Sequence, residues 1–111
     1  MKEIFKRQAE ICKTMSSPVR MEIIYVLKEG EKSVTELVEA TGLTKSNISQ
    51  HLALLKNAEM VRSRRDGVNI FYSIASPKIV EACRLMREVL MEQLLERQKF
   101  MDRLEDEISK K

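Results

Sequence analysis

Apolar residues recur every three or four positions along most of the chain, which is the spacing of one face of an α-helix. Short breaks containing glycine, proline or serine divide this pattern into segments. We therefore predict a first helix over about 2–15, a second that begins at Ser17-Pro18 and stops at Gly30, and a short third that ends at Gly42. The third helix opens on the sequence from Ser33 to Glu36, which has the form of a capping box.

The stretch TKSNISQHLALLK, residues 44–56, predicts a fourth helix with two unlike faces, capped by Thr44. Ile48, Leu52 and Leu55 fall on one side and form a core stripe. Solvated helix faces usually carry Glu and Lys, but the remaining surface here carries short hydrogen-bonding groups suited to close approach. Base edges in a DNA groove are one such partner. The residues on that surface are Ser46, Gln50 and Ala53, flanked by Asn47 and Ser49.

The third and fourth helices are joined by the tight turn Gly42-Leu43, so they predict a helix-turn-helix over about 34–56. The following stretch, VRSRRDGVNIFYSI over 61–74, predicts a β-hairpin. Its turn is expected at Asp66-Gly67, with positive φ at both positions. Three arginines lie on the first strand and near the tip, so the hairpin has the character of a basic wing.

A last helix is expected to begin at Ser76-Pro77 and to run to about residue 109, because no glycine or proline interrupts it. Such a helix is roughly 50 Å long, which exceeds the width of a small domain. Apolar residues recur along it at helical spacing, and a monomer would leave this stripe in water. We therefore expect a two-fold homodimer in which the helices at about 2–15 and 77–109 pack on the partner.

Composition fits this organisation. The length of 111 residues predicts a single domain, and the fold class expected is mainly α (α+β), a winged helix-turn-helix in the order α-α-α-α-β-β-α. The formal net charge is +3, and residues 44–72 hold five basic residues against two acidic ones. This is a weak electrostatic footprint for nucleic acid. Charges throughout the first twelve residues argue against a signal peptide or membrane span, so we expect a cytoplasmic protein without a membrane partner.

These observations predict binding to double-stranded DNA. The early residues of the fourth helix would reach base edges in the major groove, with Gln50 best suited to a bidentate contact with adenine. Arginines of the wing would lie along phosphates or an adjacent minor groove and set register and affinity. Two copies related by a dyad would require a near-palindromic operator. The predicted DNA-binding residues are Thr44, Lys45, Ser46, Asn47, Ser49, Gln50, Lys56, Arg62, Arg64 and Arg65.

The run from residue 9 to residue 74 resembles the ArsR/SmtB (arsenic-repressor) family of winged-helix regulators, and the resemblance extends over roughly residues 8–95. SSPVR, TKSNISQHLALLK and the Asp-Gly wing make it specific. The resemblance implies a homodimeric repressor that leaves DNA when a metal, metalloid or oxidant reaches a sensor site. Glu59 departs from the family pattern, in which a glycine commonly ends the recognition helix.

The resemblance does not extend to the family's metal sites. Metal-sensing members place a Cys-x-Cys pair where this chain has Ser33 and Thr35, and the last helix here has no histidine. We therefore expect no metal site and no cofactor. Cys12 and Cys83 leave three interpretations open: burial as small hydrophobic residues, with Cys12 on the apolar side of the first helix, a thiol-based redox or sulfur switch, or binding of a soft metalloid. The two thiols would approach one another if the first and last helices pack together.

The sequence also bears on two other classes of function, an enzyme and a protein-binding module. An enzyme is disfavoured because the chain has one histidine, no glycine-rich phosphate loop and no carboxylate pair near the cysteines. The histidine, His51, is expected to brace the fourth helix or to touch a phosphate. The alternative to a DNA-binding regulator is a winged-helix module that grips another protein, for which exposed aromatic residues are expected.

Overall fold

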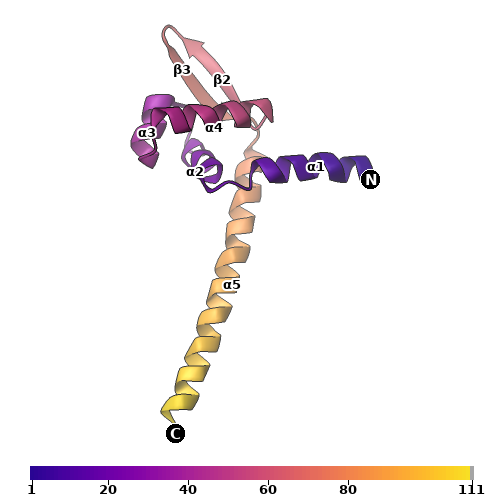
Figure 1. The fold of residues 1–111 in the computed structure, drawn as a ribbon, viewed down its shortest axis with the longest axis vertical. Coiled ribbons are helices and arrows are strands. Elements are labelled where there is room, and N and C mark those ends of the chain that lie inside the picture. Colours follow the sequence, from indigo (N-terminus) through magenta and orange to yellow (C-terminus); the bar gives the residue numbers. More distant parts are fainter. Residues whose placement is uncertain (111) are drawn as a thin grey trace. The chain divides into compact units, whose positions relative to one another are not determined.

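The computed structural model describes residues 1–110, which divide into two compact units between Val80 and Glu81. The first unit follows the winged helix-turn-helix order expected from the sequence, with one additional short strand (Figure 1). Its elements are α1 (Lys2–Thr14), α2 (Pro18–Leu27), β1 (Lys32–Ser33), α3 (Val34–Thr41), α4 (Lys45–Asn57), β2 (Val61–Asp66), β3 (Asn69–Ile74) and the beginning of α5 (Pro77–Ser109).

Hydroxyl side chains begin three of the helices, as predicted. The Ser17 hydroxyl accepts a hydrogen bond from the backbone N–H of Arg20, and Pro18 occupies the first turn of α2. Ser33 and Glu36 form a complete capping box at the start of α3, with bonds of 3.0 and 3.2 Å. The Thr44 hydroxyl accepts from the N–H of Asn47 at 3.1 Å. These caps satisfy amides that have no partner inside a helix, so they fix where α2, α3 and α4 begin.

The core lies between the helices and the first residues of the hairpin. α2 contacts α3, α4 and β3, and α3 packs on α4. Burying each large aliphatic side chain contributes about 1.5–3 kcal/mol relative to leaving it in water, so this cluster holds α4 in place. The buried residues are Ile23, Ile24, Leu27, Leu37, Ile48, Leu52, Leu55, Met60 and Val61.

The sheet is antiparallel, with strand order β1-β3-β2. Its hairpin confirms the wing, but the prediction of the turn was off by one residue. Asp66 pairs with Asn69, so the two loop residues are Gly67 and Val68, and only Gly67 has a positive φ, of 63°. In one common type of two-residue hairpin turn, only the first loop residue needs to be glycine, so Gly67 alone meets the requirement of this turn. Val68 at the tip is 98% exposed.

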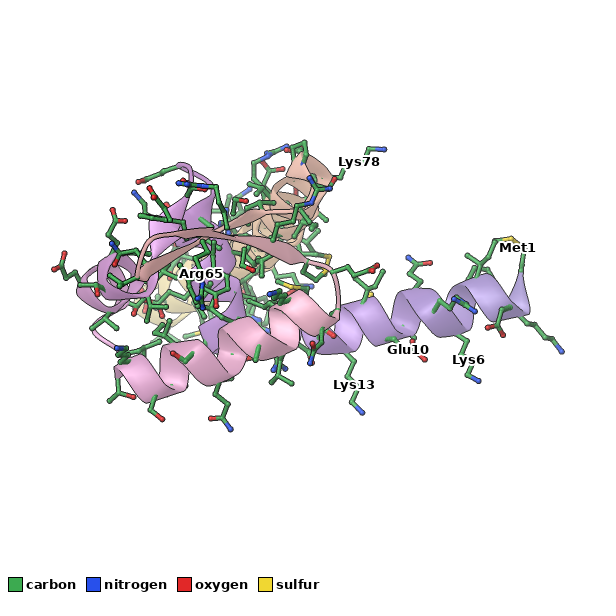
Figure 2. All side chains as sticks on the ribbon, turned by 90° about the horizontal axis from the view of Figure 1, so that it is seen from above. Met1, Lys6, Glu10, Lys13, Arg65 and Lys78 are labelled. Carbon is green, nitrogen blue, oxygen red and sulfur yellow. The ribbon has the colours of Figure 1, made fainter. Side chains whose placement is uncertain are left out.

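The first helix forms as predicted, but its apolar side is not buried within the chain. Every residue from Lys2 to Lys13 is exposed, including Ile4, Phe5 and Ile11. Lys6, Glu10 and Lys13 lie along one side of α1 (Figure 2). At the other end of the helix, the Arg20 side chain donates a 2.6 Å hydrogen bond to the carbonyl of Thr14 and ties the end of α1 to α2.

The second unit consists of α5 beyond Val80. No residue of this helix is buried, and its apolar side chains include Leu90, Leu94 and Met101, each 43–50% exposed. Its charges pair along the helix, for example where Arg84 contacts both Glu81 and Glu88. Within residues 1–110, no helix combines the length and apolar character needed to cross a membrane.

Candidate nucleic-acid interface

α4 presents the two unlike faces that its sequence predicts. Ile48, Leu52 and Leu55 have no exposed surface at all. Of the site residues predicted on and around this helix, Asn47 is half-buried on the flank, and the others are exposed: Thr44, Lys45, Ser46, Ser49, Gln50 and Lys56. The packed side therefore fixes the helix rigidly, and the polar side faces outward as a unit.

The polar groups on this face are available to an external partner. Within residues 1–110, no hydrogen bond or ion pair engages the side chains of Lys45, Ser46, Ser49 or Gln50. Only the Thr44 hydroxyl is occupied, because it caps the helix. A glutamine amide carries both a donor and an acceptor, and hydroxyls can do either, so the face can match the mixed donor and acceptor pattern of base edges.

Glu59 follows the end of α4 in the left-handed conformation, with φ of 60°, and is the one non-glycine residue of the described chain with positive φ. Its N–H donates to the carbonyl of Lys56, and the N–H of Met60 donates to the carbonyl of Leu55, both at 2.9 Å. This pair of bonds is a Schellman motif, in which glycine is the usual residue at the position of Glu59. The departure seen in the sequence therefore leaves the cap intact, at the expense of backbone strain.

The three arginines of the wing differ in their surroundings. All are exposed, and Arg65 lies on the hairpin as Figure 2 shows. Side chains alternate between the faces of a strand, so Arg65 shares a face with the buried Val61, and Arg62 shares the other with Arg64. In the described part of the chain, Arg62 and Arg65 have no hydrogen-bonded or ionic partner.

Arg64 is instead held by Glu31. Its guanidinium donates two hydrogen bonds to the carboxylate, at 3.0 and 2.6 Å, and lies over the ring of Phe71 at 4.9 Å from the ring centre. Asp66 is a more distant second partner at 3.9 Å. Hydrogen bonding from Arg64 lowers the pKa of Glu31, and the same contact raises the pKa of Arg64. A pair of parallel hydrogen bonds between a guanidinium and a carboxylate fixes the relative orientation of the two groups as well as their distance. This fork ties the wing to the segment before α3.

No local pattern in the sequence predicts this pairing. Glu31 precedes β1, which is two residues long and has no alternating pattern, so neither the strand nor its place beside β3 could be predicted. Ser33 on β1 pairs with Phe71 on β3, and Phe71 pairs with Arg64 on β2. This register brings Glu31 and Arg64 together, although they lie 33 positions apart in the sequence.

His51 lies on the flank of α4, half-buried. Its Nδ1 atom is buried and has no hydrogen-bond partner. The partial burial agrees with the expected environment of this histidine, and its role in bracing α4 stays a prediction. A contact between His51 and a phosphate stays a prediction.

Neither cysteine is fully buried within one chain. Cys12 is exposed on α1, because that helix buries none of its residues within one chain, so burial of Cys12 would need a partner chain. Cys83 on α5 is half-buried, and this desolvation raises the pKa of its thiol. Both are free thiols. Among the described residues, no three His, Cys, Asp or Glu side chains cluster in a way that could hold a metal ion.

Comparisons with known proteins agree with this geometry. The family described as bacterial regulatory protein, ArsR family, matches residues 17–63. The chain is 42% identical over 95 residues to the uncharacterised HTH-type transcriptional regulator Rv0081 of Mycobacterium tuberculosis, covering 85% of this chain and 83% of that protein. It is 34% identical over 82 residues to the transcriptional repressor PagR of Bacillus anthracis, covering 73% and 82%.

Solved structures show the same fold. The crystal structure of Rv0081 superposes with a TM-score of 0.75, covering 85% of this chain and 95% of that one. The solution structure of the homodimeric winged helix-turn-helix DNA-binding domain Mb0332 of Mycobacterium bovis is 28% identical, with a TM-score of 0.74 and coverage of 84% and 86%.

Proposed function

Because the chain belongs to the ArsR family of bacterial regulatory proteins, we propose that it recognises a specific DNA sequence through α4 and the β2–β3 hairpin. The observation that supports this most is the polar face of α4. Within residues 1–110, its Lys45, Ser46, Ser49 and Gln50 side chains have no partner, while the opposite face is fully buried. The family is one of transcriptional regulators rather than enzymes, and a DNA-binding regulator acts in the cytoplasm.

In this proposal the base contacts and the phosphate contacts come from different residues. The early residues of α4, from Thr44 to Gln50, enter the major groove, and Gln50 contacts an adenine through its amide. Arg62 and Arg65 bind phosphates, because neither has a partner among residues 1–110. Arg64 adds charge near the backbone while its guanidinium stays on Glu31.

The functional form is a homodimeric repressor on a near-palindromic operator. The apolar side of α1 and that of α5 are both exposed in one chain, and exposed apolar helices of this length mark interfaces. The similar protein Mb0332 is a homodimer, and PagR is a repressor. A dyad places two copies of α4 on successive turns of one face of the duplex, which requires two related half-sites.

Release from the operator is proposed to follow binding of a small inducer or modification of a thiol. Cys12 is the more available thiol, since it is exposed and burial raises the pKa of Cys83. If a thiol is the sensor, an oxidant should release the parent protein from its operator and should leave the Cys12→Ser, Cys83→Ser double variant bound. Release of both proteins alike would exclude the thiols.

The contact assigned to Gln50 can be tested by substitution. Gln50→Ala should relax base preference at one position of each half-site, with a loss of about 1–3 kcal/mol on the preferred sequence and little loss on the others. Binding selections with the parent and the variant on the same randomised duplexes measure this. An unchanged base preference would show that α4 does not read the sequence in this way.

A further inference from the structure

A second feature of the DNA-binding elements lies where α4 ends and the wing begins. A hollow of about 780 Å³ opens there, between the last turn of α4, the start of β2 and the segment that joins β3 to α5. Its polar lining consists of Lys56, Glu59, Arg62, Ser63 and Ser76. All of these residues belong to the first unit.

Two cations in this hollow are unneutralised. Lys56 and Arg62 are exposed, and within residues 1–110 neither forms an ion pair, although Glu59 lines the same hollow. Two unpaired cations with hydroxyl groups beside them are the donor set that phosphate oxygens prefer.

The C-terminal end of α4 carries partial negative charge and disfavours an anion, but hydrogen bonds within the chain reduce this effect. The carbonyls of Leu55 and Lys56 at the end of α4 already accept hydrogen bonds from Met60 and Glu59. Ser76 immediately precedes α5, so the hollow also borders the start of a long helix, where the backbone favours negative charge.

We propose that this hollow binds one phosphodiester of the DNA backbone between Lys56 and Arg62, and that the Glu59 carboxylate weakens this contact. The proposal rests on the proposed function, because α4 and the wing bring the DNA. The hollow is open at the surface, so a phosphate that stays joined to its flanking sugars can reach it.

Glu59 sets the strength of this contact. Its carboxylate is the one negative group in the hollow, and its backbone conformation favours glycine. A glutamine at position 59 removes the charge and keeps the side chain, whereas a glycine removes both and also relieves the backbone. The two variants therefore separate the electrostatic effect from the backbone effect.

The test measures binding of the dimeric full chain to a labelled duplex of random sequence, by fluorescence anisotropy over a series of salt concentrations. Random sequence isolates phosphate contacts, so no operator is needed. Lys56→Gln and Arg62→Gln should each lower affinity roughly three- to tenfold at low salt, with a shallower salt dependence. The double variant should lose little more than either single variant, because both cations bind the same phosphate. Lys6→Gln on α1 is the matched control and should bind like the parent.

The variants of Glu59 test the second half of the proposal. Glu59→Gln and Glu59→Gly should both raise affinity, roughly two- to fivefold at low salt, which is the size of an exposed charge interaction. The control Glu22→Gln, an exposed carboxylate on α2, should have less effect. Equal gains for Glu59→Gln and Glu22→Gln would show that only net charge matters and would overturn the assigned role of Glu59.

Other outcomes separate this proposal from the proposed function. If Lys56→Gln and Arg62→Gln bind like the parent while Gln50→Ala alters base preference, the hollow is not a phosphate site, yet the protein still reads DNA. Strictly additive losses would place the two cations on different phosphates and would also overturn the proposal. Failure of the parent to bind any duplex at low salt would remove the proposed function itself.

A last arm identifies the source of the phosphate. Inorganic phosphate is titrated into the chain without DNA, and the backbone amide shifts of residues 56–63 are followed by NMR. Shifts that saturate, and that vanish in Arg62→Gln, would support an anion site that also takes the free ion. Absence of shifts, together with the non-additive loss of DNA binding, would assign the site to the duplex backbone alone. Saturating shifts with unchanged DNA binding would contradict a DNA phosphate there.

Discussion

Exposed side chains on α4 behave differently from those on the other long helices. On α1 and α5, acidic and basic residues pair with each other at helical spacing, as Arg7 does with Glu3 and Arg84 with Glu81. The 13 residues of α4 contain no acidic side chain, so its cations and amides have no local partner. A surface of this composition gains little from neighbours in the chain and keeps its hydrogen-bonding capacity for a ligand.

Glu59 is the residue whose backbone is least suited to its side chain. Because a left-handed φ is easily adopted by glycine and strains other residues, Glu59→Gly should stabilise the protein by about 1 kcal/mol. Urea denaturation at a fixed protein concentration measures this, since dimerisation makes stability depend on concentration.

Ala58 supplies the control for that substitution. It has a φ of −84°, so Ala58→Gly relieves no strain and should destabilise the protein slightly. Equal effects of the two glycine substitutions would show that the conformation of Glu59 carries no strain.

The β2–β3 wing is held by a side-chain contact in addition to the backbone hydrogen bonds between its strands. The fork from Arg64 to Glu31 joins β2 to the segment before β1 and so restrains the hairpin from its other side. The wing can then present Arg62 and Arg65 in a fixed orientation relative to α4.

Loss of this restraint should be measurable. Glu31→Gln removes the carboxylate, so hydrogen exchange in β2 and the turn should accelerate and DNA affinity should fall, while Glu29→Gln should change neither. Because Arg64 lowers the pKa of Glu31, the restraint is fully present above the ordinary pKa of a glutamate and is lost as the pH falls through the lowered value. Unchanged exchange in Glu31→Gln would mean that the hairpin ladder alone holds the wing.

The elements also show which features a sequence can predict. The starts of α2, α3 and α4 depend on side chains within three residues, such as Thr44 and Asn47, so local patterns were sufficient. The face of α4 followed from helical spacing alone. By contrast, β1 and the pairing of Glu31 with Arg64 depend on strand register between distant segments, which no local pattern encodes. The turn was predicted one residue too early. An Asp-Gly pair is typical of a loop formed by those two residues, and the sequence does not distinguish that loop from one in which Gly67 and Val68 are the loop residues.

For the whole molecule, the main feature still to be explained is the exposed apolar surface of α1 and α5. One chain leaves the apolar side chains of α1 and α5 exposed, and we expected these helices to pack on a partner chain. Cys12 is exposed in one chain, so the interpretation of Cys12 as a buried residue depends on the expected dimer. In the proposed dimer, the interface would contribute to stability and set the spacing of the two α4 helices.

Leu90→Glu tests the interface. Leu90 is 50% exposed in one chain, so the substitution should leave the protomer folded. In the dimer it would bury an unpaired charge, so sedimentation should show a monomer, with DNA affinity at least roughly tenfold lower. Lys99→Glu, on the opposite side of α5, should remain dimeric. A dimeric Leu90→Glu protein would show that this stripe is not the interface.

The central claim, that paired α4 helices read a duplex, is tested most directly by selecting the purified protein on a library of randomised double-stranded DNA at low salt and sequencing the bound fraction. We predict enrichment of a near-palindromic sequence whose half-site centres lie about one helical turn, or a multiple of it, apart. A bound fraction with the same composition as the starting library would contradict the account.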